Sequence, residues 1–132
     1  MITDNYIKMC EQSEEIQKAW KPKKGDYYAV IVHGKPTDII DIYIDGFPLL
    51  PQKFIPLSAL YIWLPTLEQL FEMVDITKYG RLEITEFKNG YCVSQNDFYV
   101  SEISKSIHEC FLEMVMITKY HKIWTGEKWE AM

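Results

Sequence analysis

Apolar residues recur at intervals of three and four in three stretches of the chain, which is the pattern of amphipathic helices. The clearest stretch begins at Thr66, which forms an S/T-x-x-E/Q capping box with Gln69. The apolar positions that follow lie at i, i+3, i+4 and i+7 and are Leu67, Leu70, Phe71 and Val74. We predict helices over residues 4–20, 66–77 and 101–120, with N-caps at Thr3 or Asp4, at Thr66 and at Ser101.

Five shorter stretches are rich in β-branched and aromatic residues and are predicted to be strands, over residues 26–33, 39–44, 60–64, 81–88 and 91–95. The GKPTD segment is expected to separate the first two, which then pair in antiparallel fashion. Asn89-Gly90 tolerates positive φ and predicts a type I′ hairpin between the last two.

These elements predict an α+β fold with a mostly antiparallel sheet of about five strands and three helices. The alternative is a partly closed β-barrel, made by residues 26–64, with the helices added at its side. The last helix is apolar on nearly every side, because from Cys110 to Ile117 only Glu113 is polar. We therefore expect it to be covered on more than one side, by the sheet and another element or by a second subunit.

The length of 132 residues predicts a single domain, residues 1–132, and an apolar content of 48% predicts a packed core. The chain has no run of about 20 apolar residues, and its first 20 residues lack the features of a signal peptide, so we predict a cytoplasmic protein without membrane association. Cys10, Cys92 and Cys110 are scattered and are expected to be buried, reduced thiols, the alternative being reactive or metal-bound ones. A net charge of -5 argues against binding of duplex nucleic acid.

No linear catalytic, phosphate-binding or metal-binding motif is present, so no catalytic residue, metal or cofactor is predicted. Catalytic groups can converge from distant positions, and the polar candidates for such a site are His33, Asp41 and Asp45. Glu11 and Glu15 share a helix face but lack the histidine of the di-iron pattern and are interpreted as a solvated face.

Aromatic residues make up 14% of the chain, and they either fill the core or form a patch for a partner. Trp124 and Trp129 flank a Thr-Gly-Glu-Lys turn and are expected to fold back over the core. The candidates for an interaction surface or pocket are Trp63, Trp124, Trp129, Phe111 and Met114.

Three segments carry a family resemblance: YIKMCEQSEEIQ at Tyr6–Gln17, IWLPTLEQL at Ile62–Leu70 and KIWTGEKW at Lys122–Trp129. Through them the chain resembles a set of small proteins encoded by phages and prophages, mainly of Gram-positive bacteria. The resemblance supplies no activity, catalytic residue or ligand. It implies an accessory protein of a mobile genome that acts in the host cytoplasm.

Three functions follow as hypotheses. The first is a non-enzymatic protein that binds a host or phage protein, or itself as a homo-oligomer, through an aromatic surface. The alternative is an enzyme or small-ligand binder with a pocket between the sheet and Trp124 and Trp129. A second alternative is single-stranded nucleic acid binding through the lysines of residues 21–24, with Tyr27 and Tyr28 as a stacking platform.

Overall fold

The computed structural model describes residues 2–21, 25–32, 35–41, 60–74, 80–95, 99–100 and 106–132. Its helices are α1 (Asp4–Gln12), α2 (Glu14–Ala19), α3 (Leu67–Met73) and α5 (Ile107–Tyr120). Its strands are β1 (Tyr27–Val32), β2 (Lys35–Asp41), β3 (Leu60–Trp63), β4 (Leu82–Phe87), β5 (Gly90–Gln95), β6 (Tyr99–Val100), β7 (Lys122–Trp124) and β8 (Trp129–Ala131). The mixture of helices with antiparallel strands confirms the α+β class.

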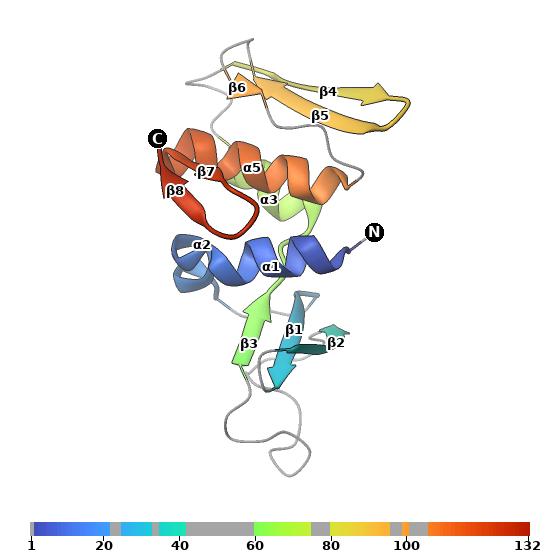
Figure 1. The fold of residues 1–132 in the computed structure, drawn as a ribbon, viewed down its shortest axis with the longest axis vertical. Coiled ribbons are helices and arrows are strands. Elements are labelled where there is room, and N and C mark those ends of the chain that lie inside the picture. Colours follow the sequence, from blue (N-terminus) through green and yellow to red (C-terminus); the bar gives the residue numbers. More distant parts are fainter. Residues whose placement is uncertain are drawn as a thin grey trace.

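The strands that the structure describes form three small antiparallel sheets, so the prediction of one sheet of about five strands is wrong. The strand orders are β2-β1-β3, β4-β5-β6 and β7-β8. Figure 1 shows the first sheet at one end of the molecule and the second at the other, with the helices between them. The described parts of residues 26–64 form an open sheet and not a partly closed barrel.

Helix α5 lies at the centre of the molecule. It packs against β5 on one side and α1 on another, and it also contacts α3 and β7 (Figure 1). Its side chains from Cys110 to Met116 are all buried and form much of the core. The prediction that this helix is covered on more than one side is therefore confirmed.

The first predicted helix is broken at Ser13, where the backbone leaves the helical region with ψ at 81°. Cys10 O accepts the Ser13 hydroxyl at 2.7 Å and the Gln17 side-chain amide at 3.1 Å. The Ser13 backbone amide also donates to Cys10 O, at 3.1 Å, so α1 ends at this carbonyl and α2 begins after Ser13. The N-cap at Thr3 is confirmed, since its hydroxyl accepts the Tyr6 amide at 3.0 Å.

The capping box of α3 is confirmed in both directions between Thr66 and Gln69. The helix ends at Met73, earlier than residue 77, because Val74 already has extended ψ. Its predicted apolar face is only partly buried. Leu70 and Val74 belong to the core, whereas Phe71 is 46% exposed.

Helix α5 begins later than predicted. Ser106 is its N-cap and accepts the Glu109 amide at 3.3 Å, so the prediction of Ser101, which lies outside the described residues, is wrong for this helix. The sequence contains three serines here, Ser101, Ser104 and Ser106, and all offer the same local signal for an N-cap. The helix ends at Tyr120 as predicted, with His121 in the left-handed region at φ 56°.

The predicted hairpin between β4 and β5 is confirmed, with Phe87 opposite Gly90. Its turn residues are Lys88 and Asn89, and neither has positive φ, so the turn is not of type I′. Strand β2 also begins earlier than predicted and includes Pro36. A proline is compatible with this strand because β2 is the outer strand of its sheet and the register shifts beside it.

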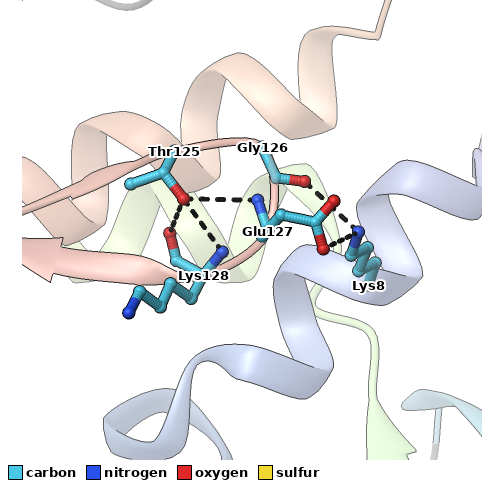
Figure 2. Close-up of polar contacts among 5 residues, drawn as sticks. All are labelled: Lys8, Thr125, Gly126, Glu127 and Lys128. Carbon is cyan, nitrogen blue, oxygen red and sulfur yellow. Dashed lines mark hydrogen bonds and ion pairs between the residues drawn. The ribbon is translucent and has the colours of Figure 1, made fainter.

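The chain ends in the hairpin of β7 and β8, whose turn lies where the sequence predicts it. Thr125 Oγ1 accepts the backbone amides of Glu127 and Lys128, and Lys8 of α1 reaches Gly126 O at 3.2 Å and Glu127 Oε2 at 3.1 Å (Figure 2). Trp129 is buried and donates from Nε1 to Met9 O at 2.9 Å. The hairpin is thus fixed to α1.

Candidate binding site

An apolar groove lies where α3, β4 and the start of α5 meet. It has a volume of about 410 Å³, and its apolar lining consists of Leu67, Phe71, Ile84, Ile107 and Phe111. The deepest of these is Phe111, which belongs to the core. Phe71 of α3 and Ile84 of β4 also line the groove and are 46% and 51% exposed. Large apolar side chains that remain this exposed around a hollow are typical of a binding surface.

The sides of this apolar groove carry negative charge. Glu68 and Glu72 of α3 belong to its lining, and both are exposed. On β4, the exposed Glu86 lies two positions after Ile84 and therefore on the same face of the strand, whereas the exposed Glu83 lies on the other face. Glu83 forms an exposed ion pair with Arg81 at 3.4 Å, which screens part of its charge. The groove therefore combines an apolar floor with acidic sides.

A second hollow, of about 380 Å³, lies beside the end of α2, and we call it the tryptophan hollow. It is lined by Ala19, Trp20, Lys21, Asp26, Trp63, Gln69, Glu72, Met73 and Lys119. The indoles of Trp20 and Trp63 are stacked, with centroids 6.1 Å apart and an interplanar angle of 5°.

Asp26 holds the walls of the tryptophan hollow together. Its Oδ2 accepts from Trp20 Nε1 at 2.9 Å, and its Oδ1 accepts from Gln69 Nε2 at 2.7 Å. The aspartate itself is almost fully buried. Because both carboxylate oxygens bind wall residues, its evident role is to join α2, β1 and α3.

The aromatic and apolar candidates do not gather at one site. Trp63 lies at the tryptophan hollow and Phe111 on the floor of the apolar groove, whereas Met114 is fully buried in α5. Trp124 and Trp129 contact each other with centroids 5.1 Å apart, and they line neither hollow.

Of the polar candidates, His33 and Asp45 lie outside the described residues, and Asp41 ends β2 opposite Tyr27. Within the described ranges, no three His, Cys, Asp or Glu side chains gather closely enough to hold a metal ion. Tyr28 is fully buried, which removes it as a stacking platform for nucleic acid bases.

Two buried groups of α1 have perturbed acidity. Burial raises the pKa of the Cys10 thiol. It also raises the pKa of the Tyr6 hydroxyl well above its ordinary value. The Tyr6 hydroxyl donates to Pro65 O at 2.6 Å, which joins α1 to the segment before α3. Both groups therefore stay protonated at neutral pH and serve packing and hydrogen bonding.

Sequence reasoning identified Phe111 but missed Phe71, Ile84, Leu67 and Ile107 as groove residues. A signal was present for the two exposed ones, since Phe71 lies between Glu68 and Glu72 and Ile84 between Glu83 and Glu86. An apolar residue surrounded by carboxylates in this way is a candidate for a surface position.

No family model, no curated protein and no solved structure matches this chain. None of the helices that the structure describes is long and apolar enough to cross a membrane.

Proposed function

We propose that this protein acts by binding another protein through the apolar groove. The observation that carries the proposal is the exposure of Phe71 and Ile84, from two different elements, around a hollow that is also lined by the core residue Phe111. Burying such side chains contributes about 25 cal/mol per Å² of apolar surface removed from water, which favours association.

The acidic sides of the groove define the chemistry of the partner. The carboxylates of Glu68 and Glu72 belong to the groove lining, that of Glu86 lies on the same face of β4 as Ile84, and the whole chain has a net charge of -5. Complementary charge steers association and excludes partners of like charge. The expected partner segment therefore presents apolar side chains accompanied by lysine or arginine.

The phage or prophage context is part of this proposal. The resemblance of Tyr6–Gln17, Ile62–Leu70 and Lys122–Trp129 to small phage-encoded proteins implies that the partner is a host or phage protein in the host cytoplasm. Of the residues that line the apolar groove, only Leu67 and Glu68 lie in these three segments. Partner choice would thus depend mainly on residues outside the family motifs.

The test is a selection of random peptides, displayed on their own messenger RNA, on the purified wild-type protein. The binding of enriched peptides is then measured by fluorescence anisotropy with the wild type, Ile84→Ser and Ile123→Ser. Ile123 is a matched control, since it is 45% exposed on β7 and does not line the groove. We expect Ile84→Ser to weaken binding about tenfold or more and Ile123→Ser to leave it unchanged.

Phe71→Ser provides a second groove variant, and urea unfolding verifies that each variant is folded. Peptides enriched through the groove should also bind more weakly as salt increases, because the carboxylates contribute to binding. Enrichment of no peptide, or equal binding by the wild type and both groove variants, would overturn the proposal.

A further inference from the structure

Strand β4 forms one wall of the apolar groove and is also an outer strand. The order of its sheet is β4-β5-β6, and no strand in the described part of the chain pairs with the far edge of β4. The side chains from Glu83 to Phe87 are all exposed. In an antiparallel pair, alternate residues of the outer strand direct their backbone N–H and C=O groups away from the neighbouring strand. Within the described residues, this edge of β4 therefore offers a row of backbone donors and acceptors that no other strand pairs with.

The register of β4 determines which side chains lie over the groove. Ile84 pairs with Val93, which is fully buried in the core, and Ile84 itself lines the groove. Because successive side chains of a strand point to opposite faces, Leu82 and Glu86 share the groove face with Ile84. Glu83 then lies on the opposite face.

Resting on the proposed function, we infer that the partner segment binds as an additional β-strand along the free edge of β4. An extended segment can form hydrogen bonds with the open backbone groups of β4. A helix cannot, because its backbone groups are already hydrogen-bonded to each other. Every second side chain of the added strand enters the apolar groove between Ile84 and Phe71. The intervening side chains lie on the face of Glu83, which favours lysine or arginine there.

The charged side chains along the free edge of β4 indicate which kind of strand can bind there. In an antiparallel pair of two β4 strands centred between Ile84 and Thr85, Glu83 of each copy would lie opposite Glu86 of the other. Like charges directly opposite each other in a strand pair are destabilising. A basic and apolar partner of different sequence therefore fits the edge better than self-association.

The test uses a groove-dependent peptide from the selection described above. Two forms of it are synthesised, each with backbone N-methyl groups at alternate residues, one form at odd positions and the other at even positions. A strand added to β4 directs only one of these two sets of amides towards the protein. We expect one form to lose binding by at least about tenfold and the other to bind as the parent does.

If both N-methylated forms lose the same amount of binding, strand addition is overturned. If the enriched peptides also have apolar residues at intervals of three and four, the partner segment binds as a helix. That result would leave the proposed function intact, since the peptides would still depend on Ile84. Sedimentation of the free protein as a dimer that Ile84→Ser dissociates would instead make a second copy the occupant and overturn the inference.

Discussion

Gln69 joins the start of α3 to the residue that precedes β1. Its Nε2 donates to Asp26 Oδ1 at 2.7 Å, while its Oε1 accepts the Thr66 backbone amide at 2.9 Å. A capping box accepts either Glu or Gln at this position. Only the amide of Gln can also donate a hydrogen bond to Asp26. The contact with Asp26 therefore favours Gln over Glu at position 69, which the capping box alone does not.

Replacing Gln69 by Glu should therefore destabilise the protein although the capping box is retained. The variant removes a donor and brings a second carboxylate to Asp26, which should lower the free energy of unfolding by about 1–3 kcal/mol. Urea unfolding measures the change. Glu68→Gln is the control, an exposed change of charge in the same helix, with an expected effect within about 0.5 kcal/mol. Equal stability of Gln69→Glu and the wild type would contradict the assignment.

The side-chain amide of Gln17 forms hydrogen bonds with both backbone groups of Trp63, as the backbone of a neighbouring strand would. Its Oε1 accepts Trp63 N at 2.8 Å, and its Nε2 donates to Trp63 O at 3.0 Å. Gln17→Leu keeps the size of the side chain but leaves both backbone groups without this partner, at an expected cost of about 1–3 kcal/mol in chemical unfolding. The same substitution at the exposed Gln12 should cost much less. If the two variants lose equal stability, the pairing with Trp63 contributes nothing.

The ion pair between Glu15 and Lys122 should stabilise the protein in a pH-dependent way. Burial alone would raise the pKa of Glu15, but the hydrogen bond and charge of Lys122 outweigh it and hold the pKa below its ordinary value of 4.5. The ion pair therefore contributes to stability above about pH 4.5, and this contribution is lost as the pH falls through the lower pKa that Glu15 has in the folded state.

Glu15→Gln should lower the free energy of unfolding by less than about 1 kcal/mol near neutral pH, because both side chains are partly exposed. The difference from the wild type should disappear at strongly acidic pH, which urea unfolding at both pH values would measure. Glu14→Gln, an exposed neighbour, controls for the change in net charge. A difference that persists unchanged in acid would contradict the pairing.

The three thiols should be unreactive in the native protein. Cys10 and Cys110 are fully buried, Cys92 is nearly so, and burial raises the pKa of the Cys10 thiol. Reaction with a chromogenic disulfide reagent should therefore be limited by opening of the fold and should accelerate as urea is added. Protein unfolded in guanidinium provides the reference. Rapid labelling of the folded protein would contradict this burial.

The parts of the fold that sequence predicted best depend on local interactions. Thr66 and Gln69 are three residues apart, and the β4–β5 hairpin closes over a short turn, so neighbouring residues specify both. The break at Ser13 depends in addition on Gln17 reaching Trp63, 46 positions away. The division of the described strands into three sheets depends on pairings such as that of β1 with β3, which are far apart in the sequence, and no local pattern contains that information.

The binding site was harder to predict for a related physical reason. The periodicity of α3 placed Phe71 on the apolar face, but periodicity does not specify where the covering layer ends. In the structure the core covers Leu70 and stops short of Phe71, which leaves the latter at the groove. Tyr28 shows the opposite outcome, since a residue proposed for a surface role is fully buried.

The hydrogen bond from Trp129 Nε1 to Met9 O also affects how the protein folds in a cell. The two residues are 120 positions apart, so α1 leaves the ribosome long before its partner strand is made. Until β8 emerges, Met9 O and the surface that Trp129 covers remain open to chaperones and to other nascent chains. The contact between α1 and β8 can therefore form only after the 120 positions that separate the two residues have been synthesised.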